Sequence, residues 1–258
     1  MEISVTVWGD LACFTSPTTK VERLSQAVPT PSAARGILSS VYSKPKEFFW
    51  MVTKIEVLKP IRYISVRRNE VKDKLGNDMQ PIDTNDPDKR TPRQTVFLYD
   101  VRYRITAQIV PRPDYHGTVE QLYAQAERRI KGGKCFCQPA LGLRECVAYF
   151  SESDPNEKPI QQDMDLGLMV YDIFDLHDAE VRKKTRTRLS LYHAVMKQGV
   201  IEVPPYDSPE VRYAETAVRL CHALPAAAAS GHGEKDGKGM GLPWRKWHVP
   251  WREAGRRG

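Results

Sequence analysis

The chain has 258 residues, of which 41% are hydrophobic and 28% are charged, and its formal net charge is +7. These proportions are ordinary for a globular protein, and no apolar run is long enough to span a bilayer, which excludes a membrane-spanning helix. The N-terminus, MEISVTVWGD, lacks the features of a signal peptide, so we expect a cytoplasmic protein. The positive charge is compatible with nucleic-acid binding but does not establish it.

Five cysteines are present: Cys13, Cys135, Cys137, Cys146 and Cys221. An odd number of cysteines without an export signal argues against a disulfide framework. Three of them, at 135, 137 and 146, have in principle the chemistry to hold zinc, but no second pair follows at a familiar spacing. We interpret all five as reduced thiols and expect no metal and no other cofactor.

The first predicted elements are a strand and a helix. Polar and apolar residues alternate over residues 2–8, which predicts a half-buried strand that ends before Gly9. Thr30 can cap the helix that follows, and Pro45 requires that helix to end. Tyr42 is then in the last turn, where its ring either packs against the helix end or reaches solvent or a ligand.

Three further strands are predicted around a polar loop. Residues 48–58 and 61–71 are rich in aromatic and β-branched side chains, and they follow each other closely enough for a hairpin or a tight bend. Residues 72–93 hold little to bury and predict a flexible loop. The segment 95–110 has one apolar face, and we expect the other face, which includes Arg104, to be open to water or a polyanion.

The second half of the sequence predicts another helix and several strands. The helix covers 118–131, an interrupted strand region covers 134–150, and two or three strands lie within 164–206. Lys197-Gln198-Gly199 predicts a hairpin turn among them, and a closing helix is expected at 209–224.

This order of elements predicts an α+β fold with a ferredoxin-like (RRM-like) βαββαβ core and an inserted hairpin. We expect a ferredoxin-like domain at 1–150 and a smaller antiparallel, β-rich domain at 151–225. Residues 226–258 are interpreted as a disordered basic tail.

Several segments in fixed order carry a resemblance to a known family: VWGDLACFTSPTTKVERLS, TPSAARGIL, YSKP, VLKPIR, SVRRNEV and, at 128–146, RRIKGGKCFCQPALGLREC. They closely resemble the fifth family of CRISPR-associated proteins, subtype I-C (Dvulg), in the RAMP superfamily. The resemblance covers roughly residues 3–205 and implies a ferredoxin-like N-terminal domain with a smaller β-rich C-terminal domain.

The resemblance also implies an activity and partners. Such a protein cuts within each repeat of precursor CRISPR RNA without a metal, by attack of a ribose 2′-OH, and then stays on the 5′ handle of the product. Its partners would be CRISPR RNA, the backbone and large subunits of the type I-C interference (Cascade) complex and, through that complex, target DNA. No membrane is involved.

The family's catalytic residues carry over only in part. A tyrosine at the end of the first helix matches Tyr42, but Gln121-Leu122 stand where the family has a Lys-His pair. The nearest substitutes are Tyr115-His116, and of these we choose His116, because histidine titrates near neutral pH. Two alternatives follow: either His116 has taken the role, or the protein cuts slowly or not at all and serves as a handle-binding subunit.

Polar and basic residues in or near the matched segments are predicted to bind RNA phosphates. They are Lys20, Arg23, Arg35, Lys44, Arg67, Arg68, Asn69, Lys131, Lys134 and Arg144. Lys44 or Lys131 could also stabilise the charged transition state. A third alternative is a general nucleic-acid-binding module that uses the basic tail, whose binding would weaken steeply with salt and ignore sequence.

Overall fold

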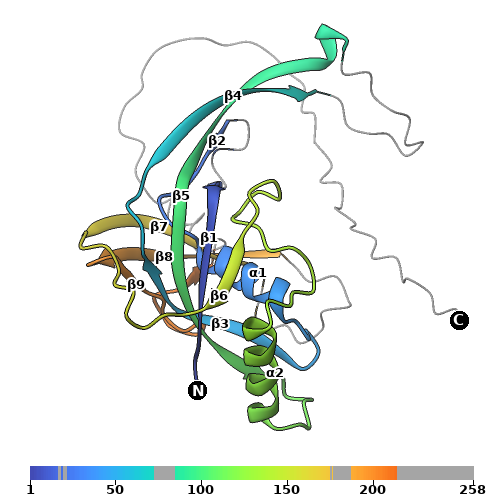
Figure 1. The fold of residues 1–258 in the computed structure, drawn as a ribbon, viewed down its shortest axis with the longest axis vertical. Helices are drawn as coiled ribbons and strands as arrows, with labels where there is room; N and C mark the ends of the chain where they lie inside the picture. The colour runs from blue at the N-terminus through green and yellow to red at the C-terminus, as the bar shows by residue number, and fades with distance from the viewer. Residues whose placement is uncertain (17–18, 20–21, 73–84, 175, 177–186, 214–258) are drawn as a thin grey trace, which may run out of the picture.

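The computed structural model describes residues 1–16, 19, 22–72, 85–174, 176 and 187–213. Within them the protein is a mostly antiparallel sheet with two α-helices, which confirms the α+β prediction (Figure 1). Lys20, Cys221, most of the predicted loop and the predicted tail lie outside the described residues. No described helix is long and apolar enough to cross a membrane.

The sheet is built on one long strand, β5 (Arg90–Pro111), which pairs with four others. On one edge lie β1 (Ile3–Ala12), antiparallel to it, and the short parallel strand β2 (Arg23–Leu24). On the other edge, β3 (Phe48–Val57) and β4 (Tyr63–Val71) follow each other end to end.

The pairing corrects three predictions. β1 continues through Gly9 to Ala12, because it keeps its register with β5 beyond that glycine. β3 and β4 make no hairpin with each other, since both pair with β5. Arg90–Arg93, predicted as loop, form the first part of β5 opposite the end of β4. β4 and the start of β5 form an arm that extends away from the other elements (Figure 1).

The predicted helix after Thr30 and the predicted helix at 118–131 are both confirmed. α1 (Pro31–Val41) begins where the Thr30 side chain accepts a hydrogen bond from the Ala33 amide at 3.1 Å. It ends at Tyr42, whose amide donates to the carbonyl oxygen of Leu38 at 2.9 Å. α2 (Val119–Lys131) ends at Gly132 and lies at the opposite end of the molecule from the arm (Figure 1).

The remaining strands extend the sheet at both edges. They are β6 (Tyr149–Glu152), which pairs with β1, and β7 (Met164–Phe174), β8 (Thr187–Lys197), β9 (Val200–Glu202) and β10 (Arg212–Tyr213). The predicted β8–β9 hairpin is confirmed, with positive φ angles at Gln198 and Gly199. The predicted closing helix is wrong at its start, where Arg212–Tyr213 pair with β8 as a strand, and its later residues lie outside the described part.

One prediction about β5 fails for a physical reason. Its apolar face is buried as expected from Val101 to Ile109, although Tyr99 on the same face is 46% exposed. Arg104 on the opposite face is also buried, with 8% of its surface exposed. The guanidinium donates to Glu56 Oε1 at 3.0 Å and to the carbonyl oxygens of Asp154 and Glu157 at 2.6 Å each. The loop after β6 therefore covers this face and accepts hydrogen bonds from the buried guanidinium, whose charge Glu56 compensates.

Gly142 lies in the matched segment at 128–146, and its conformation requires a glycine. Its φ is +87°, and a Cβ placed there would lie 2.0 Å from the carbonyl oxygen of Cys13. Only glycine combines this conformation with so close an approach. The segment around it thus packs against the end of β1.

Candidate active site

Tyr42 lies at the junction of α1 and β3, and its position is fixed from two sides. Its ring packs against Phe48 with the ring centroids 5.1 Å apart. The indole N–H of Trp50 donates to the Tyr42 carbonyl oxygen at 2.8 Å. With 5% of its surface exposed, Tyr42 is part of the core as well as of a surface cleft.

This cleft, called here the Tyr42 cleft, has a volume of about 420 Å³. It lies between the end of α1 and α2, and it is lined by Tyr42, Ser43, Lys44, Tyr115, Gln121, Leu122, Gln125, Arg129 and Phe136. The structure therefore brings Gln121-Leu122, the residues in place of the Lys-His pair, next to Tyr42. His116 is exposed in the loop before α2 and does not line the cleft, whereas its neighbour Tyr115 does.

Burial sets the protonation state of the tyrosine. Desolvation raises the pKa of Tyr42, Glu47 and Tyr115 raise it further, and Lys44 and Arg129 oppose the shift. A phenol whose pKa lies above its ordinary value of about 10 is neutral at pH 7. Tyr42 is thus suited to donate a hydrogen bond or a proton, and unsuited to act as a base.

Two cations line the cleft, and their partners differ. Lys44 Nζ lies 3.0 and 2.9 Å from the two carboxylate oxygens of Glu47, and this hydrogen bond raises the pKa of Lys44. Arg129 Nε donates to the carbonyl oxygen of Val41 at 2.7 Å, which satisfies a carbonyl of the last turn of α1. The charge of Lys44 is therefore compensated, while Arg129 bonds to a neutral group.

The predicted RNA-binding residues fall into several places. Four of them share a second cleft of about 430 Å³, called here the arm cleft, which is lined by Arg23, Arg68, Asn69, Glu70, Leu143, Arg144 and Glu145. Arg68 Nη1 lies 2.5 Å from Glu145 Oε1, and Arg23 pairs with Glu70. The arm cleft is therefore basic but partly neutralised by its own carboxylates.

Other predicted contacts lie apart from both clefts. Arg35 makes a two-point ion pair with Asp172, at 2.6 and 2.9 Å, that ties α1 to β7. Arg67 and Lys134 are exposed. Lys131 lines a third cleft.

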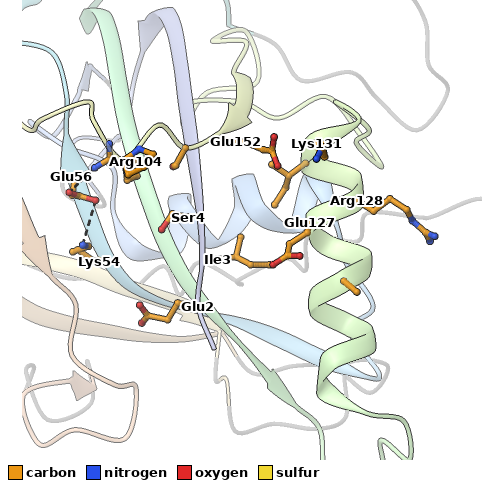
Figure 2. Close-up of a pocket in the computed structure, with 14 residues that line it drawn as sticks. Glu2, Ile3, Ser4, Lys54, Glu56, Arg104, Glu127, Arg128, Lys131 and Glu152 are labelled. Atoms are coloured by element: carbon orange, nitrogen blue, oxygen red, sulfur yellow. Dashed lines mark hydrogen bonds and ion pairs between the residues drawn. The ribbon is translucent and has the colours of Figure 1, made fainter.

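The third cleft has a volume of about 800 Å³, and Figure 2 shows acidic and basic side chains together along its lining. Its lining includes four carboxylates, those of Glu2, Glu56, Glu127 and Glu152, and four cations, those of Lys54, Arg104, Arg128 and Lys131. Such a balanced surface does not favour a polyanion. The described residues contain no group of three or more His, Cys, Asp or Glu residues placed to hold a metal.

Gln125, Arg129 and Phe136 line the Tyr42 cleft but were not predicted as site residues, and Tyr115 was named only beside His116. Arg129 and Phe136 stand within the matched segment at 128–146, which was the available signal. Gln125 gave no such signal, because its approach to Tyr42 depends on how α2 packs.

Comparison with known proteins gives concordant matches. Residues 3–204 match a family described as CRISPR-associated protein (Cas_Cas5). The CRISPR pre-crRNA endoribonuclease Cas5d of Mannheimia succiniciproducens is 39% identical over 230 residues, which cover 81% of this chain and 98% of that protein. The protein of the same name from Thermus thermophilus is 37% identical over 213 residues, which cover 78% of this chain and 91% of that protein.

Two solved structures have a similar fold. One, described as a CRISPR-associated protein, gives a TM-score of 0.59 at 24% identity and covers 82% of this chain and 96% of its own. The other, a functionally uncharacterized protein from Streptococcus mutans, gives a TM-score of 0.58 at 22% identity and covers 82% of this chain and 97% of its own.

Proposed function

Because the chain belongs to the Cas5d family of CRISPR-associated proteins, subtype I-C, we propose that it is a metal-independent endoribonuclease that cuts CRISPR repeat RNA in the Tyr42 cleft. Two relatives, whose matched regions cover 98% and 91% of their own length, carry the name of a pre-crRNA endoribonuclease. The observation that carries the proposal is Tyr42 itself, held rigidly at a cleft with a raised pKa and with Arg129 beside it.

The reaction requires only groups of the RNA and of the protein. A base removes the proton of the ribose 2′-OH, and the oxygen attacks the adjacent phosphorus in line with the leaving 5′ oxygen. An acid protonates that 5′ oxygen as its bond to phosphorus breaks. The products are a 2′,3′-cyclic phosphate and a 5′-hydroxyl.

The roles follow from the environments of the side chains. Tyr42, as a neutral phenol, donates its proton or a hydrogen bond to the departing oxygen or to a phosphate oxygen. Arg129 stabilises the charge on the phosphate, with Lys44 as a second cation whose charge Glu47 compensates. His116 remains our candidate for the base, and this role requires its loop to move toward the cleft on binding.

We further propose that the cut RNA stays bound by its 5′ handle as the protein joins the interference complex. The arm cleft, with Arg23, Arg68 and Arg144, supports this because it gathers cations away from Tyr42. The strand order β3–β5–β1–β6, with α1 after β1 and α2 after β5, supports a ferredoxin-like layout of residues 1–150. The boundary to a β-rich domain at 151–225 remains a prediction.

The alternative is a handle-binding subunit without catalysis. Gln121 and Leu122 favour it, because both line the Tyr42 cleft and neither an amide nor an alkyl group can transfer a proton at neutral pH. In that case the Tyr42 cleft would bind the repeat and leave it intact.

Matched substrates distinguish the two. Purified protein is incubated with its repeat RNA and with the same RNA carrying a 2′-deoxy nucleotide at the cut site. We expect cleavage of the first and none of the second, because the deoxy RNA lacks the attacking oxygen. Tight binding of both RNAs without cleavage of either would establish the alternative.

A further inference from the structure

Phe136 is the most exposed aromatic side chain of the Tyr42 cleft, with 68% of its surface in water. Tyr42, which lines the same cleft, is 5% exposed. Within the described part of the chain, no aromatic pair or cation–π contact includes Phe136. Single exposed apolar residues are common, so exposure alone does not indicate a ligand. The hydrogen bonds that hold the loop carrying this ring are the additional observation that indicates a ligand.

The loop that carries Phe136 is tied to both helices. The amides of Phe136 and Cys137 donate to the carbonyl oxygen of Ser40, at 2.7 and 3.2 Å, in the last turn of α1. The amide of Lys134 donates to the carbonyl oxygen of Arg129 in α2 at 2.8 Å. The ring is thus presented at a fixed place relative to Tyr42, so a ligand that binds to it need not order the loop first.

The surroundings of the ring suit a nucleotide. Arg129 offers a cation, and Gln121 and Gln125 offer amide donors and acceptors. Single-stranded nucleic acid is bound by aromatic rings that stack on bases, beside cations that contact the phosphates. An apolar side chain of a partner protein would displace water from these polar groups without replacing its hydrogen bonds, which is unfavourable.

We propose that Phe136 is a base-stacking platform, on which one unpaired base of the repeat RNA lies while the adjacent phosphate faces Arg129 and Tyr42. The proposal rests on the proposed function, because it takes repeat RNA as the ligand. It concerns binding, however, and requires no chemistry. The stacked base would decide which phosphate of the repeat reaches Tyr42.

Affinity for repeat RNA with a 2′-deoxy nucleotide at the cut site tests the platform, since this RNA cannot be cut by the proposed route. Phe136→Ala should weaken binding about 5- to 150-fold, the range that corresponds to one lost base stack. Phe136→Trp should keep the wild-type affinity, whereas Phe136→Leu, which is apolar but not aromatic, should not. Leu168→Ala, at a 71% exposed side chain on β7, is the matched control and should bind as the wild type does.

Single abasic sites placed along the RNA identify the stacked base. At one position the abasic site should weaken wild-type binding by the same factor as Phe136→Ala, and should have no further effect on that variant. Equal affinities of Phe136→Ala and wild type, or losses that add at every position, would overturn the platform. A wild-type protein that binds this RNA but leaves the uncut ribose version intact would refute the nuclease, and the abasic scan would still decide the platform.

Discussion

The Tyr42 cleft and the arm cleft have nearly the same volume, but they differ in how their charged groups are held. In the arm cleft, Arg23 and Arg68 are paired with the carboxylates of Glu70 and Glu145. In the Tyr42 cleft, Arg129 is held by a backbone carbonyl and a buried phenol lies beside it with a raised pKa. Perturbed titratable groups mark sites of chemistry, whereas a surface cleft that holds more arginines than carboxylates, as the arm cleft does, suits phosphate binding.

The difference predicts that cutting and holding RNA can be impaired separately. Changes in the Tyr42 cleft should lower the rate at which bound RNA is cut. Changes in the arm cleft should lower affinity and its dependence on salt.

The largest effect is expected from Tyr42→Phe. It removes the hydroxyl and keeps the ring that packs against Phe48, so the fold should be unchanged. Loss of a group that transfers a proton in the transition state lowers the rate about 10²- to 10⁴-fold. Single-turnover cleavage with the RNA fully bound measures it. A rate within threefold of wild type would assign Tyr42 to packing alone.

The second largest effect is expected from Arg129→Ala. Its cleavage rate should be about 10²- to 10³-fold lower, because one donor that stabilises charge in the transition state is removed. The matched control is Arg128→Ala, one residue earlier on α2, whose side chain donates to Gln125 and lines the third cleft. Arg129 also bonds to the carbonyl oxygen of Val41, which fixes the position of its guanidinium. Arg129→Lys keeps the positive charge and removes the guanidinium, so it tests whether the charge alone is sufficient. Equal losses in both alanine variants would show that only the total charge of α2 matters.

Arg35→Ala should affect stability and leave RNA affinity nearly unchanged. It leaves the Asp172 carboxylate, whose side chain is 3% exposed, without its cation, and breaking a buried ion pair costs about 3 kcal/mol. Urea unfolding measures the loss, and Arg67→Ala, at an exposed position of the arm, serves as the control. If Arg35→Ala instead kept full stability and lost RNA affinity, the phosphate contact predicted from sequence would be correct.

The smallest effect is expected from Arg144→Ala in the arm cleft. Removing one phosphate contact should weaken binding modestly and reduce the slope of log affinity against log salt by about 1. The slope is measured on uncut deoxy RNA from low to high salt. An unchanged slope would remove Arg144 from the RNA-binding surface.

Local signals in the sequence predicted much of the fold. Thr30 and Pro45 defined the ends of α1, and glycine with a short polar turn defined the β8–β9 hairpin. The burial of Arg104 could not be predicted, because it depends on a loop some 50 residues later that supplies carbonyl oxygens. The end-to-end arrangement of β3 and β4 depends likewise on a strand that both share.

The candidate site was predictable to a smaller extent. Tyr42 and the substitution by Gln121-Leu122 came from the matched segments, and the structure brings both to one cleft. Arg35 was assigned to RNA from its matched segment, whereas its ion pair with Asp172 could not be predicted, because the two residues are 137 positions apart in the sequence. His116 was chosen for its titration range alone, and proximity in sequence did not bring it to the lining of the cleft.

The most direct measurement is cleavage of the repeat RNA in EDTA, with the ends of the products identified. We predict that the wild-type protein cuts at one position at an undiminished rate and leaves a 2′,3′-cyclic phosphate and a 5′-hydroxyl. Cleavage that stops in EDTA, or products that carry a 5′-phosphate, would contradict attack by the 2′-OH in the Tyr42 cleft.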